Sequence, residues 1–316
     1  MLLLLWLLKT ADSVGVQEGA QGLKDGLLFP SGLCGVVEHR SLAISTGSFQ
    51  PSPTREAVRR IAKLGFKHVE VTVQDSELNY DFYRRTDMDY FEELRSLVHE
   101  LGLRVTSLHA PQLSAVQTFS SKARHEIMTR FLEIASLFQG DLLVVHPYHI
   151  FRSYEAACSF LSDDSPGTGN FMVPEFPSVL ANAKENGLRI AIENIAHWHD
   201  HPLLNEPRNM LKLVSSLDSE TVGVDLDIFH SELGGTTFEF LDKLRDHILS
   251  LHLCDYGDSR NRTLPGKGRV NWEKLAGLIE NLEKLDYILM EVAGQFEDEE
   301  LGNSAGYLRG VFGLEP

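Results

Sequence analysis

Four apolar runs in the second half of the chain each carry, at or next to the C-terminal end, a side chain that can bind a metal ion. These side chains are Glu193, Asp227, His252 and Glu291. A carboxylate in a run of valine and leucine costs roughly several kcal/mol unless something pairs with it. Because the carboxyl ends of parallel strands meet at one face of a barrel, we expect the four to converge there. Three carboxylates and one imidazole suit Mn²⁺, Mg²⁺ or Co²⁺ and admit Zn²⁺. The sequence therefore predicts one divalent metal ion, with one or two positions open for substrate oxygens.

The elements that would position these side chains alternate regularly from residue 42 onward. The expected strands are 42–46, 68–73, 104–108, 142–145, 189–192, 222–226, 248–253 and 287–292. Segments with helical spacing lie between them, at 53–64, 87–101, 121–138, 177–185, 207–216, 237–245 and 271–285, and a glycine-interrupted segment follows the last strand. Short apolar strands are typical of a parallel sheet covered on both faces. Eight strand–helix units over about 250 residues predict an α/β fold, a (β/α)8 TIM barrel.

Residues 1–40 show no such pattern. We predict an N-terminal extension that is poorly ordered, followed by a barrel over residues 41–316. The first eight residues are nearly all leucine, but they are too few to span a bilayer and no basic residue precedes them. A cleaved signal peptide is the less favoured interpretation of this stretch.

Net charge and cysteine content indicate which partners and which compartment to expect. The chain has 45 acidic and 29 basic residues, a net charge of −16, which disfavours binding to nucleic acid or to anionic membranes. Its three cysteines are too few and too scattered for a disulfide framework. We therefore expect a reducing compartment, and a cytoplasmic location.

Other polar residues stand where further strands end, and we predict that they contact the substrate. They are Glu70, His109, His146, His230, Asp255 and Arg262. Some alternatives stay open: the histidines at strand ends are also compatible with hydrogen-bonded structural roles, Glu70 with a role behind a metal ligand, and Arg262 with solvent exposure. Asp225 shares a strand face with Asp227 and could compete with it as a ligand.

Two long segments between strands stand close to the predicted site. The histidine-rich run 197–201 is either a substrate lid, a further metal site or, as we favour, a solvated loop. The segment 148–170 is long for a connection between a strand and a helix, and we expect it to cover the site.

From about residue 42 the chain resembles the xylose isomerase-like superfamily of TIM barrels. That superfamily includes sugar and sugar-phosphate isomerases and epimerases, and nucleases of the endonuclease IV type. The matching segments are 65–70, 108–111, 145–147, 192–194, 226–230, 251–255 and 265–272. The resemblance implies that Glu193, Asp227, His252 and Glu291 bind one divalent metal ion. It also implies that Glu193 and Glu291 flank the substrate and move its protons.

The nuclease branch of the superfamily holds three zinc ions. Residues matching His109, His146 and His230 are ligands there. The third zinc also needs an Asp-x-His pair after the seventh strand, and the segment 265–272 lacks it. This segment resembles the epimerase branch instead.

These observations predict a metal-dependent isomerase or epimerase that acts on a sugar, sugar phosphate or polyol through an enediolate. A dehydratase of the same superfamily is the alternative, and a zinc phosphodiesterase is less favoured. A non-catalytic barrel that only binds a ligand would not need three carboxylates held together. The predicted partner is a small carbohydrate, with no nucleic acid and no membrane, and a homo-oligomer stays open.

Overall fold

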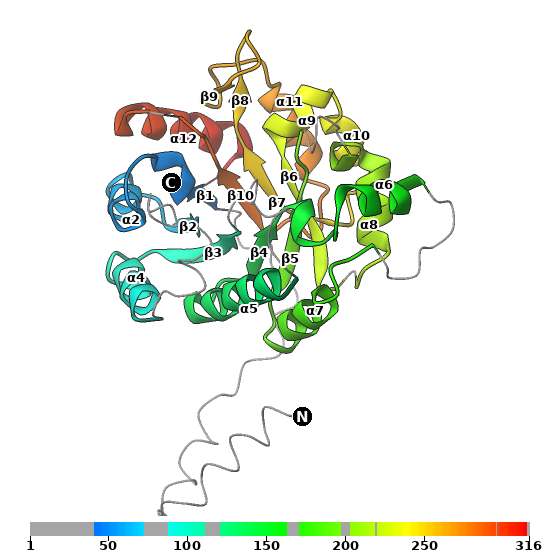
Figure 1. The fold of residues 1–316 in the computed structure, drawn as a ribbon. Helices are drawn as coiled ribbons and strands as arrows, with labels where there is room; N and C mark the ends of the chain where they lie inside the picture. The colour runs from blue at the N-terminus through cyan, green and yellow to red at the C-terminus, as the bar shows by residue number, and fades with distance from the viewer. Residues whose placement is uncertain are drawn as a thin grey trace, which may run out of the picture. The chain divides into compact units, whose positions relative to one another are not determined.

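The computed structural model describes residues 41–72, 88–110, 121–162, 171–196, 203–218, 220–294 and 296–314. Its strands are β1 (Leu42–Ser45), β2 (His68–Val71), β3 (Arg104–His109), β4 (Leu142–Val145), β5 (Arg189–Glu193), β6 (Val222–Asp227), β7 (Ile248–Leu253) and β10 (Tyr287–Met290). These eight strands are parallel and close a barrel in the order β1-β10-β7-β6-β5-β4-β3-β2 (Figure 1). The predicted (β/α)8 barrel is confirmed. The predictions for residues 1–40 and for the run 197–201 fall outside the described residues.

Helices alternate with the strands around the barrel (Figure 1). They are α2 (Thr54–Lys63), α4 (Met88–Glu100), α5 (Ser121–Phe138), α6 (Tyr154–Ser162), α7 (Phe176–Glu185), α8 (Pro207–Ser215), α9 (Ile228–Gly234), α10 (Thr237–Lys243), α11 (Trp272–Ile279) and α12 (Asp298–Phe312). An antiparallel hairpin of β8 (Asp255–Tyr256) and β9 (Arg262–Thr263) follows β7. Within the described residues, none of the helices combines the length and the apolar character that crossing a membrane requires.

Three helices differ from the sequence prediction. The helix α6 lies in the segment expected to be loop, α9 begins directly after β6, and α12 is a regular helix where a glycine-interrupted segment was expected. Packing decides α12: its Leu301, Ala305 and Leu308 are buried, so tertiary contacts offset the low helix propensity of its glycines. The helix α11 ends at Ile279 rather than near residue 285, although Leu282 and Leu285 stay buried.

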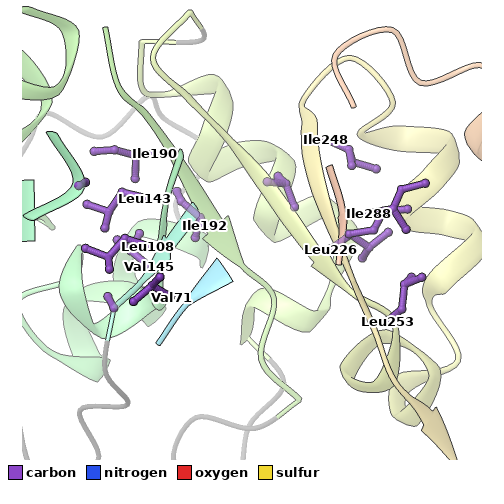
Figure 2. Close-up of a cluster of buried hydrophobic side chains, with 14 of the residues drawn as sticks. Val71, Leu108, Leu143, Val145, Ile190, Ile192, Leu226, Ile248, Leu253 and Ile288 are labelled. Carbon is purple, nitrogen blue, oxygen red and sulfur yellow. The ribbon is translucent and has the colours of Figure 1, made fainter. Parts of the chain in front are cut away.

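Strand side chains alternate between the helices and the barrel interior. Residues such as Val71, Ile192, Leu226 and Leu253 belong to the large hydrophobic cluster that also contains the helix side chains, and Figure 2 shows several of its strand members. A second, small cluster of Leu142, Val144, Ala191 and Leu249 comes from β4, β5 and β7 and fills the interior of the barrel. The barrel interior is therefore apolar at the level of this cluster, and its polar side chains lie in a layer at the carboxyl ends of the strands.

On the face of β6 that points into the barrel, the first residue is Gly223. A Cβ there would lie 2.5 Å from the carbonyl oxygen of His247 and 2.5 Å from Cγ of Leu249. Because the Leu249 side chain already occupies this space, only glycine fits. Two and four residues further on, the same face of β6 carries Asp225 and Asp227 at the level of the polar layer.

Candidate active site

The four predicted metal ligands converge at the carboxyl ends of their strands. One donor atom from each of Glu193, Asp227, His252 and Glu291 lies within 4.8 Å of the donor atoms of the other three. We call this set the four-donor group. Glu193 ends β5, Asp227 ends β6, His252 lies in β7 and Glu291 directly follows β10. In the barrel, β6 and β7 lie between the strands of the two glutamates.

Asp227 is held by its neighbours so that one carboxylate oxygen stays free. Its Oδ1 accepts a hydrogen bond from the backbone N–H of His230 at 2.7 Å and so caps α9. The Asn194 side chain fixes the backbone of Asp227, accepting from its N–H at 2.7 Å and donating to its carbonyl at 3.1 Å. Asn194 lay in a matched segment, but its role in holding Asp227 was not predicted.

The remaining atoms fit a cation. Oδ2 of Asp227 and Nδ1 of His252 are buried, and neither has a hydrogen-bond partner among the described residues. Nδ1 of His252 lies 3.4 Å from Oε2 of Glu291 and 4.0 Å from Oε1 of Glu193. Carboxylates this close repel one another unless a positive charge sits between them, so the donor set matches a hard divalent ion.

Glu193 also faces two histidines with its second oxygen. Oε2 lies 2.9 Å from Nε2 of His146 and 3.2 Å from Nε2 of His109. These three residues form a second group of possible ligands within 4.8 Å. Although burial acts to raise the pKa of Glu193, His146 and His109 outweigh it and hold the pKa well below its usual range. Glu193 is therefore ionised and joins the two groups.

Both ring nitrogens of His109 face oxygen acceptors. Its Nδ1 donates to the carbonyl of Ala110 at 2.7 Å, and its Nε2 faces Glu193. Burial acts to lower the pKa of His109, but Glu193, Glu70 and Glu291 outweigh it and raise the pKa to about 10. His146 differs, because burial dominates and lowers its pKa.

Arg262 and His230 lie at the edge of the four-donor group. Nη2 of Arg262 is 3.2 Å from Nε2 of His230 and 3.6 Å from Oδ2 of Asp227, and its guanidinium stacks 4.4 Å above the ring of Phe229. Nη1 of Arg262 is buried and has no hydrogen-bond partner among the described residues. The hairpin β8–β9 thus brings the Arg262 guanidinium to the edge of the four-donor group, through Nη2.

Comparison with known proteins places the chain in a family. The model of the family described as "Xylose isomerase-like TIM barrel" matches residues 58–310. The chain belongs to this family. Among its sequence relatives, it is 25% identical over 255 residues to an uncharacterised protein of Methanocaldococcus jannaschii, covering 78% of this chain and 79% of that one. It is 23% identical over 235 residues to a D-psicose 3-epimerase of Enterocloster bolteae, covering 73% and 74%.

Solved structures with the same fold are found as well. A D-tagatose 3-epimerase-like protein superposes with a TM-score of 0.66 at 17% identity, covering 86% of this chain and 97% of that one. A protein called IOLI, crystallised with a zinc atom, gives a TM-score of 0.63 at 17% identity, covering 86% and 98%. These two solved structures share the fold of this chain.

Glu70, predicted to contact the substrate, and Asp225, the possible competing ligand, both lie outside the four-donor group. Glu70 is fully buried in β2, where its Oε2 accepts from Oγ of Ser107 at 2.8 Å and lies 3.2 Å from Nε2 of His252. Glu70 thus lies behind His252, a member of the four-donor group. This is the alternative role that the sequence left open for Glu70. Asp225 is also fully buried, its nearest site contact being Nδ1 of His252 at 3.1 Å, and it is outside the four-donor group.

Asp255 holds a loop, and this geometry leaves it no oxygen for a substrate. Its Oδ1 accepts from the N–H groups of Tyr256 and Val270, and its Oδ2 from those of Gly266 and Gly268 and from Nε1 of Trp272, all at 2.9–3.1 Å. A Cβ on Gly268 would lie 2.3 Å from Oδ1 of Asp255, so the loop can close around the carboxylate only with glycine there. The sequence could not show this, because the five donors come from a folded loop.

Replacing Asp255 by asparagine is expected to lower the free energy of unfolding by about 3 kcal/mol or more. The amide NH₂ would face donors, and each buried donor without an acceptor costs about 1–3 kcal/mol. Urea denaturation measures this. The matched control is Asp258→Asn in the same loop, where the ion pair with Arg269 is exposed and should contribute less than about 1 kcal/mol. Equal losses in the two variants would contradict the role of Asp255.

Affinity for a divalent metal is expected to rise with pH. Burial acts to lower the pKa of His252, but Asp225, Glu70 and Glu291 outweigh it and raise the pKa well above its usual value. A metal ion must displace the proton from the ligating nitrogen, so with one such proton the apparent Kd should fall by about tenfold per pH unit below that pKa. Competition with a chelating dye at several values between about pH 6 and about pH 8 measures the slope. A Kd that is flat across this range would contradict the assignment of His252.

Proposed function

We propose that this chain is a metal-dependent isomerase or epimerase of a sugar, sugar phosphate or polyol. The observation that carries the proposal is the four-donor group, in which two glutamates from strands separated by β6 and β7 meet one aspartate and one histidine. The 23% identity to a D-psicose 3-epimerase over most of the chain supports the substrate class.

The chemistry divides between a metal ion and the protein's own side chains. A bound Mn²⁺, Mg²⁺, Co²⁺ or Zn²⁺ ion supplies electrophilic stabilisation of negative charge on adjacent substrate oxygens. Glu193, Asp227, His252 and Glu291 would hold it. Arg262, through Nη2, and His230 would orient the substrate oxygens beside Asp227.

Glu193 and Glu291 would move the proton. Burial acts to raise the pKa of Glu291, but His252 and His109 outweigh it and lower the pKa to about 2. Both glutamates therefore begin as carboxylates, the form that a general base needs. One removes the proton bound to carbon and later releases it to water. The other takes up a proton from water and delivers it to the opposite face of the planar enediolate, which inverts that carbon.

The test is a panel of ketoses, aldoses, sugar phosphates and inososes, incubated with the metal-loaded protein and followed by proton NMR. We expect a product that is an isomer of its substrate. A product that has lost water would assign the dehydratase alternative instead. No conversion of any member of the panel by fully metal-loaded protein would contradict the proposal.

A second candidate is a metal-dependent phosphodiesterase. One observation favours it: His109, His146 and Glu193 form a further three-donor group beside the first. Against it stand the net charge of −16 and the segment 265–272, which has no Asp-x-His pair. We propose that nucleic acid is not a substrate. Metal-dependent cleavage of abasic duplex DNA at physiological salt would overturn that part of the proposal.

A further inference from the structure

His252 is the one member of the four-donor group that has a carboxylate at each ring nitrogen. Nδ1 lies 3.1 Å from Oδ2 of Asp225, and Nε2 lies 3.2 Å from Oε2 of Glu70. All three side chains are fully buried. A neutral imidazole has one N–H and one lone pair, so only one of these nitrogens can bind a metal while the other keeps its proton.

Geometry distinguishes the two nitrogens. Nδ1 faces the four-donor group, because it is the atom closest to Glu291 and Glu193. Nε2 faces away from the group, toward Glu70 on the other side of the ring. The proton therefore belongs on Nε2 when a metal ion is bound.

Glu70 is itself fixed in place. Its Oε2 accepts a hydrogen bond from Oγ of Ser107 at 2.8 Å, on the neighbouring strand β3. The register between β2 and β3 shifts between Val69 and Glu70, so that Glu70 pairs with Ser107. Such an irregularity re-aims a side chain, and here it places a hydroxyl donor and an imidazole donor on one carboxylate oxygen.

We propose that Glu70 is a positioning residue that holds the Nε2 proton of His252 and so directs Nδ1 toward the metal. This inference rests on the proposed function only in that His252 is a metal ligand; it does not depend on which sugar is converted. Histidines that bind metals commonly donate their other N–H to a carboxylate, which selects the tautomer and the ring orientation. Glu70 thus acts behind a metal ligand, the alternative that the sequence left open beside a substrate contact.

The direct test is NMR of the full chain with isotope-labelled histidine, loaded with NMR-active cadmium and measured without any sugar. We expect scalar coupling between cadmium and Nδ1 of His252, and a proton on Nε2. Coupling to Nε2 instead would overturn the proposal. This measurement uses the unaltered protein and so does not depend on the folding of a variant.

Variants give a second, independent readout. For Glu70→Gln we expect the Kd for cadmium to rise by about 10–100-fold, the usual cost of losing such a partner. The reason is that the glutamine NH₂ competes to donate to Nε2 and favours the wrong tautomer. A Kd within about twofold of the unaltered protein, with coupling still at Nδ1, would overturn the proposal.

Two serines provide a matched pair, since each donates its hydroxyl to one of the carboxylates beside His252. Ser107 donates to Glu70, and Ser250 donates to Asp225. We expect Ser107→Ala to weaken cadmium binding in the direction of Glu70→Gln, and Ser250→Ala to change the Kd by less than Ser107→Ala does. The reverse order would contradict the proposal. If cadmium couples to Nδ1 but no sugar is converted, the proposed function fails while this inference stands.

Discussion

Glu291→Gln, assayed at saturating metal, is expected to lower turnover by about 10²-fold or more, the usual contribution of a general base. Glutamine keeps the size of the side chain but cannot accept a proton at neutral pH. Because Glu291 also belongs to the four-donor group, its loss should weaken metal binding, so the Kd for the metal must be measured first. The steady-state rate at a metal concentration far above that Kd then reports the lost proton transfer.

A matched control is Glu280→Gln, which removes an exposed carboxylate at the end of α11 and should leave turnover unchanged. The sharper measurement is solvent exchange. The unaltered protein in D₂O should place deuterium at the epimerised carbon, because the returning proton comes from a carboxylate that exchanges with water. Product without solvent deuterium at that carbon would favour either return of the same proton, shielded from water, or a hydride shift. It would remove the main support for proton transfer by two glutamates.

The largest effect on metal binding is expected from Asp227→Asn. Outer partners of metal ligands contribute about 10–100-fold to affinity, so the loss of a directly ligating carboxylate should exceed about 100-fold. The variant suits this test because asparagine can still accept the N–H of His230 and cap α9. Isothermal titration with Mn²⁺ or Co²⁺ measures the loss, and circular dichroism verifies that the fold is kept.

Asp225→Asn is the matched control, since it lies on the same face of the same strand. Burial raises the pKa of Asp225 to about 7, so near neutral pH asparagine removes only part of a charge at this position. Asp225 is also outside the four-donor group. We expect the Kd of the Asp225→Asn variant for the metal ion to change by less than about tenfold, which is below the range for outer partners of metal ligands. If Asp225→Asn weakened binding as much as Asp227→Asn, Asp225 would be the competing ligand that the sequence left open.

The sequence alone was sufficient for the barrel and for the convergence of the four donors. Short apolar runs between helical segments define the strands, and parallel strands in a barrel present their carboxyl ends at one face. The four donors stand at or next to those ends: Glu193, Asp227, His252 and Glu291. Their convergence therefore follows from the strand pattern and from the common direction of the strands. Their role as metal ligands stays a proposal until metal binding is measured.

Local pattern was insufficient where long-range packing decides. The helix α12 forms because Leu301, Ala305 and Leu308 are buried, although its glycines argue against a helix. Asp255 holds a loop because donors up to 17 residues away fold back onto its oxygens. Hydrogen bonds of this kind depend on distances between residues far apart in the sequence, which composition and periodicity do not encode.

The surroundings of His252 show the same division most sharply. Glu70 and Asp225 each follow a shift in strand register, one between β2 and β3 and the other between β6 and β7. These shifts pair Glu70 with Ser107 and Asp225 with Ser250. The sequence determined that carboxylates would occupy these strands. Only the closed barrel, through its register, decided that they would flank one imidazole and leave a single nitrogen facing the other ligands.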